Sequence, residues 1–299
     1  MNTPLLVLRT MRPKQWTKNV LLFGGLVFSK HLLNGELLLR SLLGFCVFCI
    51  LSGLVYVIND ITDIDKDKNH PKKKYRPIAS GAVSPGLALA FSCVLSVLAL
   101  ALAAHLSLRF AIISAVYPAV MVLYSYVLKH VVILDIMTIS AGFVIRALAG
   151  AIVVNVDFSG WLIACTIFLS LFLAIAKRRH ELISLGDDAE AHRFILKEYT
   201  AQLLDQMISI MTASTILAYT LYTMSPEITE KFGTEYLYLT VPFVLYGMLR
   251  YLYLVYRKEK GGSPAQILLE DIPLIVDILL WGGLVFLLVY WHALRRLLF

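Results

Sequence analysis

The chain has 299 residues, of which 59% are apolar and 16% are charged, and its formal net charge is +7. A soluble domain carries about a quarter charged residues. The composition therefore excludes a soluble globular enzyme, a disordered chain and a coiled coil, and it indicates a polytopic membrane protein.

Nine largely uncharged apolar runs approach the length of ~20 residues that one helical crossing of a bilayer requires. We expect spans near residues 17–33, 39–58, 85–105, 109–128, 133–154, 160–177, 205–224, 236–256 and 272–292. The first is the weakest, because Lys30 and His31 follow a short apolar core, and an interfacial or re-entrant helix is the alternative. The prediction is an all-α integral membrane protein with about nine transmembrane helices in a single domain, residues 1–299.

Two long polar stretches, residues 59–84 and 178–204, interrupt the apolar runs. With nine spans the loops form two sets, and both stretches belong to the set that holds most of the Lys and Arg residues. The positive-inside rule places this set in the cytoplasm. Because long loops in a tightly connected bundle are usually functional, we expect the active site there.

An acidic motif follows the second predicted span. If that helix continues past the membrane edge, Asp60, Asp63 and Asp67 share one face at spacing i, i+3, i+7. Their charges repel each other, and the helix macrodipole adds to the repulsion. Mg²⁺ would relieve it, because this ion prefers oxygen ligands and commonly binds one or two carboxylates together with substrate phosphates. The alternative is a solvated loop in which the neighbouring lysines balance the aspartates.

The pattern Asn59-Asp60-x-x-Asp63-x-x-x-Asp67 resembles the first signature of the UbiA superfamily of intramembrane prenyltransferases. This resemblance implies a helical bundle with a cytoplasm-facing active-site cavity. It also implies that Asn59, Asp60, Asp63 and Asp67 are the catalytic residues, which bind a substrate diphosphate through Mg²⁺. Residues 12–19, 70–81, 142–146 and 177–182 further resemble the branch of decaprenyl-phosphate phosphoribosyltransferases.

The second acidic signature of aromatic prenyltransferases is an Asp-x-x-x-Asp pattern, and it is missing. The corresponding region instead begins with a basic run at residues 177–179, and Asp187 and Asp188 are adjacent. The branch resemblance implies Mg²⁺-dependent transfer of the 5-phosphoribosyl group from 5-phosphoribosyl diphosphate to a polyprenyl phosphate, with release of diphosphate. A site for several phosphate groups needs basic side chains besides the carboxylates.

Residues 124–129 also resemble an element of the superfamily, Tyr-Ser-x-x-Leu-Lys. These resemblances imply the following candidate substrate-binding residues: Lys14, Lys18, Asn19, Lys73, Arg76, Tyr124, Lys129, Arg146, Lys177, Arg178, Arg179 and Glu181. Two of them have structural alternatives, since Lys14 could be an interface anchor and Lys129 a snorkelling helix end. Arg146 lies mid-span, where an exposed charge costs ~3 kcal/mol or more, so we expect it to face a polar cavity or a carboxylate.

Two other functions are weighed against this one. An aromatic or quinone prenyltransferase would use a prenyl diphosphate, and the basic run at residues 177–179 argues against it. A transporter would line its pathway with Arg146, Arg250 and Asp277, but no convincing inverted repeat supports it. Alternatively, Arg250 and Asp277 pair with each other.

The expected location is the bacterial inner membrane. The expected partners are the bilayer, the polyprenyl phosphate lipid and 5-phosphoribosyl diphosphate. We expect no nucleic acid, and family precedent allows a homo-oligomer.

Overall fold

The computed structural model describes residues 3–32, 34–69, 71, 73–157, 159–185, 194–257, 267 and 270–298. The chain forms two compact units, Met1–Phe158 and Ser159–Phe299, which we call the N-terminal unit and the C-terminal unit. Within the described residues, eight helices are long and apolar enough to cross a membrane. The protein is therefore a multi-pass helical membrane protein.

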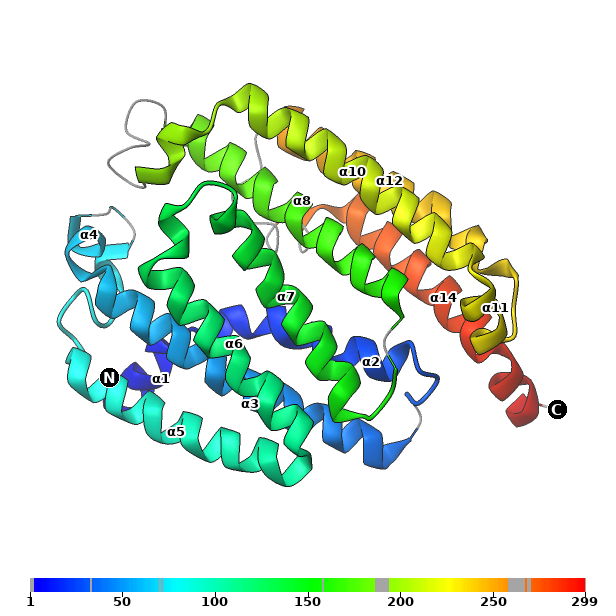
Figure 1. Cartoon of the computed structure of the whole chain (residues 1–299), viewed down its shortest axis with the longest axis horizontal. Coiled ribbons are helices and arrows are strands. Elements are labelled where there is room, and N and C mark those ends of the chain that lie inside the picture. Colours follow the sequence, from blue (N-terminus) through cyan, green and yellow to red (C-terminus); the bar gives the residue numbers. More distant parts are fainter. Residues whose placement is uncertain are drawn as a thin grey trace. The chain divides into compact units, whose positions relative to one another are not determined.

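Four long helices form the body of the N-terminal unit (Figure 1). They are α3 (Gly35–Thr62), α5 (Pro85–Leu106), α6 (Leu108–Tyr126) and α7 (Leu134–Val153). The shorter elements are α1 (Thr3–Thr10), the 3-10 helix η1 (Pro13–Leu22), α2 (Phe23–Val27), α4 (Ile64–Asn69), η2 (Lys73–Tyr75) and η3 (Leu128–His130). Polar caps fix the helix starts, since Asn34, Ser84 and Ser107 each accept hydrogen bonds from backbone N–H groups of the first turn.

The C-terminal unit contains four long spans and several short helices. Its elements are α8 (Gly160–Leu185), η5 (Phe194–Glu198), α10 (Ala201–Met224), α11 (Pro226–Phe232), η6 (Tyr236–Thr240), α12 (Val241–Arg257) and α14 (Ile272–Leu298). Helix α10 packs against α8 and α12, and α12 packs against α14. Thr200 caps the start of α10, and Gly233 ends α11 with a φ of 64°.

Eight of the nine predicted spans correspond to these long helices. The exception is the span predicted at residues 17–33, where the chain forms η1 and α2 instead of one long helix. Lys30 adopts a φ of 63°, which a continuing helix does not allow. The two predicted loops are also partly helical, because α3 continues to Thr62 and α8 to Leu185.

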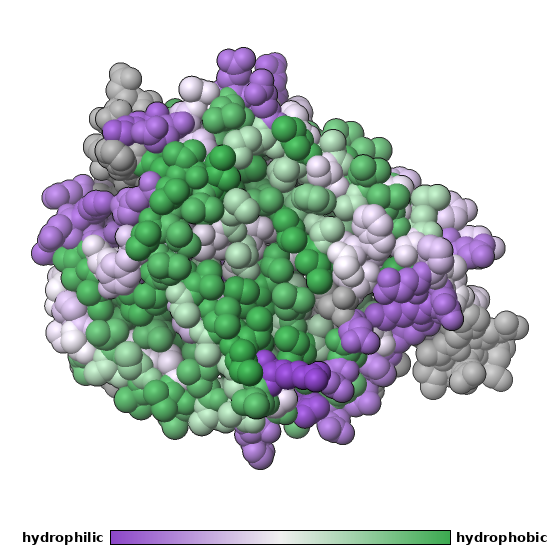
Figure 2. Space-filling view, viewed as in Figure 1, coloured by the Kyte–Doolittle hydropathy of each residue, from purple (hydrophilic) through white to green (hydrophobic). Residues whose placement is uncertain are grey.

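Apolar side chains in the N-terminal unit divide between a core and an outer surface. Phe48 contacts both Phe110 and Tyr117 in a fully buried aromatic cluster. On α5, Val94 and Val97 are more than 60% exposed, and Figure 2 shows a largely hydrophobic surface over α5 and α6. A surface of this kind is expected to face lipid rather than water.

The broken N-terminal segment packs closely on α7 through two glycines. A Cβ atom on Gly25 would lie 2.6 Å from the Gly150 carbonyl oxygen, and one on Gly150 would lie 2.0 Å from the Leu22 carbonyl oxygen. Neither backbone can move independently of its helix, so only glycine allows this approach. This contact holds η1 and α2 against α7.

We expect Gly25→Ala to lower the free energy of unfolding by about 1–3 kcal/mol, because the added methyl group clashes with backbone atoms. The matched control is Gly24→Ala, since a Cβ there has no atom within 4 Å. Thermal unfolding in detergent measures both variants. Equal melting temperatures would contradict the close approach of α2 to α7.

Candidate active site

The acidic motif lies at the end of α3 and continues into α4. The Asn59 carbonyl oxygen accepts from the Asp63 backbone N–H at 3.1 Å and from the Thr62 hydroxyl at 3.0 Å, which closes the last turn of α3. Asp63 is then the C-cap residue, and α4 starts at Ile64. The motif is therefore not on one continuous helix.

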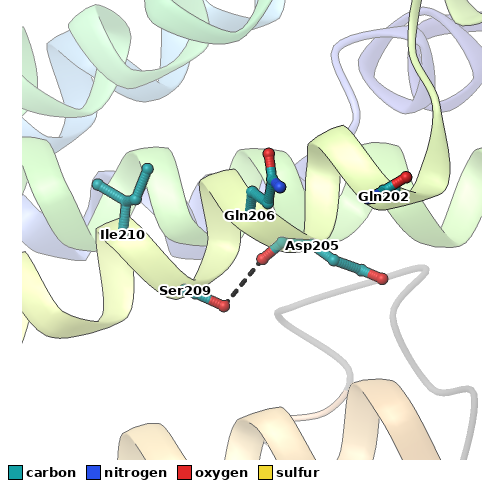
Figure 3. A pocket seen from close by; sticks show the side chains of 5 residues that line it. All are labelled: Gln202, Asp205, Gln206, Ser209 and Ile210. Atoms are coloured by element: carbon teal, nitrogen blue, oxygen red, sulfur yellow. Dashed lines mark hydrogen bonds between the residues drawn. The ribbon is translucent and has the colours of Figure 1, made fainter.

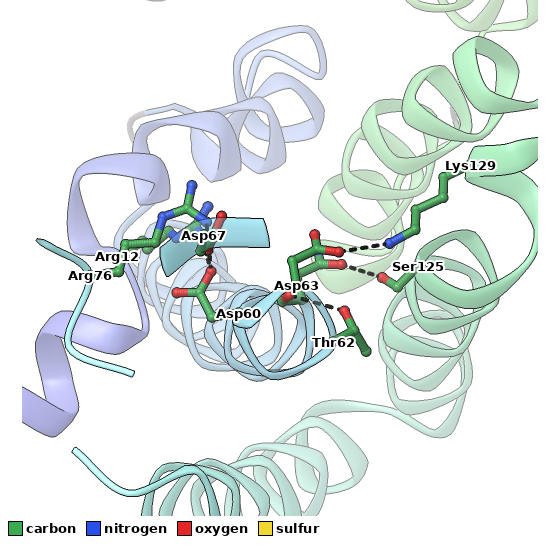
Figure 4. A network of polar contacts seen from close by, with 9 residues as sticks. Arg12, Asp60, Thr62, Asp63, Asp67, Arg76, Ser125 and Lys129 are labelled. Carbon is green, nitrogen blue, oxygen red and sulfur yellow. Dashed lines mark hydrogen bonds and ion pairs between the residues drawn. The ribbon is translucent and has the colours of Figure 1, made fainter. Parts of the chain in front are cut away.

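Two carboxylates of the motif converge on the same guanidinium group. Arg76 Nη1 donates to Asp60 Oδ1 at 3.1 Å and also to Asp67, and Arg12 donates to the same Asp60 oxygen (Figure 4). Both carboxylate side chains are only 3% exposed. The Arg12 guanidinium also lies over the Tyr56 ring, 5.0 Å from its centroid. The result is a buried cluster of two acids and two bases.

Asp63 points elsewhere, toward α6 and η3 (Figure 4). Its Oδ1 atom lies 3.2 Å from Lys129 Nζ, while Ser125 Oγ donates to Asn59 Oδ1 at 2.6 Å. The expectation that all three aspartates share one face is therefore wrong, because the helix breaks at Asp63. Within the described residues, no three acidic, His or Cys side chains are grouped closely enough to hold a metal ion.

The donor chemistry nevertheless fits Mg²⁺. Asp60 and Asp67 present buried carboxylate oxygens to a common cation, the Arg76 guanidinium. One or two carboxylates are what a protein commonly supplies to Mg²⁺ when substrate phosphates complete the shell. Asp63 and Asn59 carry further oxygen atoms in the adjacent turn, where they contact Lys129 and Ser125.

A second polar cluster surrounds Arg146 inside the N-terminal unit. Arg146 is 5% exposed, and it donates to Asn19 Oδ1 at 2.7 Å, to the Tyr117 hydroxyl at 2.6 Å and to the Gly142 carbonyl oxygen at 2.8 Å. Every one of these acceptors is uncharged. The positive charges of Arg12 and Arg146 both repel the Lys18 ammonium group. No carboxylate among the described residues contacts Arg146, and a buried guanidinium group near an ammonium group favours binding of an anion.

The other candidates in this unit lie nearer the surface. The Lys14 and Lys73 side chains are exposed, and Tyr124 is half-buried in α6. His70, which belongs to one of the resembling stretches, lies outside the described residues. The structure thus groups Asn59, Asp60, Asp63, Asp67, Arg76 and Lys129 in one region and Lys18, Asn19 and Arg146 in another.

The basic run at residues 177–179 belongs to α8 and not to a loop. Arg178 is 1% exposed, and its Nη1 atom lies 2.6 Å from Glu181 Oε2. Lys177 Nζ lies 3.7 Å from the other oxygen of the same carboxylate. Glu181 therefore contacts two of the basic side chains that were predicted to bind phosphate. Asp187 and Asp188 lie outside the described residues.

Arg179 is held by side chains of two other helices. It donates to Asp205 on α10, and its guanidinium stacks on the Tyr256 ring of α12 at 4.2 Å. The Tyr256 hydroxyl donates to the same carboxylate at 3.0 Å. This cluster connects the ends of α8, α10 and α12.

A shallow groove of about 620 Å³ follows the polar face of α10 (Figure 3). Its lining consists of Gln202, Asp205, Gln206, Ser209 and Ile210. This lining offers a carboxylate and two amides but no basic side chain. By itself the groove therefore does not suit a phosphate.

The pair of Arg250 and Asp277, which was one alternative for these residues, does not form. Arg250 instead makes a two-point contact with Asp271, with Nε to Oδ1 at 3.1 Å and Nη2 to Oδ2 at 2.9 Å. The Asp271 side chain also accepts from the Leu274 backbone N–H, at the start of α14. A carboxylate at a helix start that also accepts from a backbone N–H of the first turn is a better partner than a mid-helix aspartate.

Sequence reasoning missed Arg12, Tyr117 and Ser125 as site residues. Arg12 belongs to the N-terminal stretch that carried the family resemblance, so its motif gave a usable signal. Tyr117 and Ser125 are hydrogen-bond partners supplied by α6. Only tertiary packing brings them to Arg146 and Asn59.

The fold and the site together define a multi-pass membrane enzyme that combines acidic and basic side chains at the end of a transmembrane helix. Among protein families, the model of the UbiA prenyltransferase family matches residues 20–269. The chain belongs to this family and is a transferase.

Curated relatives and solved structures agree with this assignment. The decaprenyl-phosphate phosphoribosyltransferase of Mycobacterium tuberculosis is 32% identical, with 92% of this chain and 91% of the relative covered. The enzyme of the same name from Mycolicibacterium smegmatis is 30% identical, with 95% and 92% covered. A UbiA homolog from Archaeoglobus fulgidus bound to GPP and Mg²⁺ has a TM-score of 0.71 at 19% identity, with 95% and 99% covered, which shows the fold.

Proposed function

We propose that the protein transfers the 5-phosphoribosyl group from 5-phosphoribosyl diphosphate to a polyprenyl phosphate in a Mg²⁺-dependent reaction. The observation that carries this proposal is an acidic motif whose three aspartates each contact a basic side chain, with further basic side chains elsewhere in the same unit. Arg12, Arg76 and Lys129 contact the motif, and Lys18 and Arg146 form a second basic cluster in the same unit. The two relatives named as phosphoribosyltransferases support the same reaction.

The reaction joins a lipid phosphate oxygen to C1 of the ribose and breaks the bond between C1 and the diphosphate oxygen. The diphosphate leaves with the electron pair of that bond. A phosphomonoester has a second pKa of ~6 and is largely dianionic near neutral pH, so it needs little help from a general base. The protein then contributes mainly through positioning and charge stabilisation.

The four polar residues of the acidic motif, Asn59, Asp60, Asp63 and Asp67, would hold Mg²⁺. When bound there, the ion would neutralise the negative charge that develops on the diphosphate. Arg12, Arg76 and Lys129 lie beside these carboxylates and would bind the diphosphate oxygens. Lys18, Asn19 and Arg146 would bind a further anionic group.

The remaining substrate-binding candidates are Lys14, Lys73, Tyr124, Lys177, Arg178, Arg179 and Glu181. Because Lys177 and Arg178 already contact Glu181, this carboxylate would orient them rather than bind phosphate itself. We further propose that the protein resides in the bacterial inner membrane with its site facing the cytoplasm, where a water-soluble sugar phosphate has access.

The test is an incubation of purified protein in detergent with Mg²⁺, a polyprenyl phosphate and radiolabelled 5-phosphoribosyl diphosphate. We expect label to enter the lipid phase and this transfer to stop when EDTA is added. If the label stays in the aqueous phase while a prenyl diphosphate reacts with an aromatic acceptor, the proposed reaction is wrong.

A further inference from the structure

Basic side chains neutralise every aspartate of the acidic motif in the structure. Asp60 contacts Arg12 and Arg76, Asp67 contacts Arg76, and Asp63 contacts Lys129. A divalent cation at these carboxylates must therefore replace positive charge that the protein itself supplies.

Arg76 is the strongest of these internal cations. It contacts two carboxylates, whereas Arg12 and Lys129 each contact one. Both of its partners are 3% exposed, so water screens the interaction poorly. Arg12 is also fixed by its contact with the Tyr56 ring, whereas Arg76 follows the short helix η2.

We propose that Arg76 competes with the metal for Asp60 and Asp67, and that it moves to the substrate phosphates when metal and diphosphate bind together. This inference rests on the proposed function. The Arg76 side chain is 26% exposed, so it can leave the carboxylates without crossing the core. A guanidinium group binds phosphate oxygens with the same forked geometry that it uses for carboxylates.

The exchange keeps the charge of the site balanced. Without substrate, the guanidinium neutralises the carboxylates. With substrate, the metal takes the carboxylates and Arg76 takes part of the phosphate charge. The free metal ion should therefore bind weakly, and diphosphate should promote its binding by giving the displaced Arg76 a new partner.

Mn²⁺ binding, measured by electron paramagnetic resonance on the purified full chain, tests this inference without any turnover. We expect Arg76→Gln to bind Mn²⁺ about tenfold more tightly than the natural protein when no diphosphate is present, because the competing cation is gone. In the presence of Mn²⁺, the same variant should bind pyrophosphate about tenfold more weakly. Arg76→Lys should give a smaller gain in Mn²⁺ affinity, since one ammonium group cannot bridge both carboxylates as well.

The matched control is Lys68→Gln, which removes one positive charge from α4. Lys68 is 56% exposed and lies 3.6 Å from the exposed Asp65. This control should change Mn²⁺ affinity by less than about twofold. Thermal unfolding identifies variants that do not fold, and Arg76→Lys then provides the decisive comparison.

The inference is overturned if the folded Arg76 variants bind free Mn²⁺ no more tightly than the natural protein, or if Lys68→Gln gives the same gain. These binding measurements separate this inference from the proposed function. If the Mn²⁺ pattern holds but no phosphoribosyl transfer occurs, only the proposed function fails. If transfer occurs but the Mn²⁺ pattern is absent, only the role of Arg76 fails.

Discussion

Replacing Asp60 with Asn should reduce phosphoribosyl transfer roughly a thousandfold, while the protein still inserts and folds. Asp60 is 2% exposed and contacts both Arg12 and Arg76. Asn has the same shape but no charge, so it weakens metal binding, and a catalytic metal contributes several kcal/mol to transition-state stabilisation. The measurement is the initial rate of label transfer to the lipid at saturating Mg²⁺.

Asp65→Asn is the matched control for this substitution. It makes the same chemical change five residues further along the chain, but its carboxylate is 97% exposed. We expect its rate to stay within about twofold of the natural protein. A folded Asp60→Asn variant that retains a tenth or more of the natural rate would contradict the assignment of Asp60 to the metal site.

Replacing Arg146 with Met should reduce the rate by about a hundredfold or more, since it removes the buried charge that we propose binds a substrate anion. Arg146 is 5% exposed, and each acceptor that it reaches within the described residues is neutral. A guanidinium group in such surroundings is costly to bury, so structural stability alone does not explain its presence. Steady-state kinetics with both substrates measures the loss.

Melting temperature separates a functional role for Arg146 from a structural one. The substitution removes the donor to the Asn19 Oδ1 atom and to the Tyr117 hydroxyl, which destabilises the fold, but it also removes a buried charge, which offsets the loss. We therefore expect a small change in melting temperature together with the large loss of rate. The conservative variant Arg146→Lys should recover part of the rate. A strong loss of stability with an unchanged rate per folded molecule would argue for a structural role.

Most of the fold follows from hydropathy, because a membrane span requires a long apolar run with few charges. The apolar runs that form α5 and α14, for example, predict both helices and their starts at residues 85 and 272. The same criterion also predicts a span at residues 17–33, but this segment is not one helix. Its path depends on the packing of Gly25 against Gly150, which lie far apart in the sequence.

The candidate site was only partly predictable. The spacing of the aspartates and the family resemblance identified Asn59, Asp60, Asp63 and Asp67, and their functional role stays a prediction. Helical periodicity could not show that α3 ends at Thr62, which turns Asp63 toward Lys129. Nor could spacing show that Arg250 contacts Asp271 rather than Asp277, because this choice depends on the start of α14, where the Leu274 backbone N–H also donates to Asp271.

The most direct test of the central claim uses 5-phosphoribosyl diphosphate with carbon label in the ribose and phosphorus label in the β-phosphate. The two labels are followed during incubation with polyprenyl phosphate and Mg²⁺. Transfer of the phosphoribosyl group predicts that the carbon label enters the lipid phase, while an equal amount of phosphorus label appears in the aqueous phase as diphosphate. Phosphorus label in the lipid, or no carbon label there under conditions where the protein is folded, would contradict the proposed reaction.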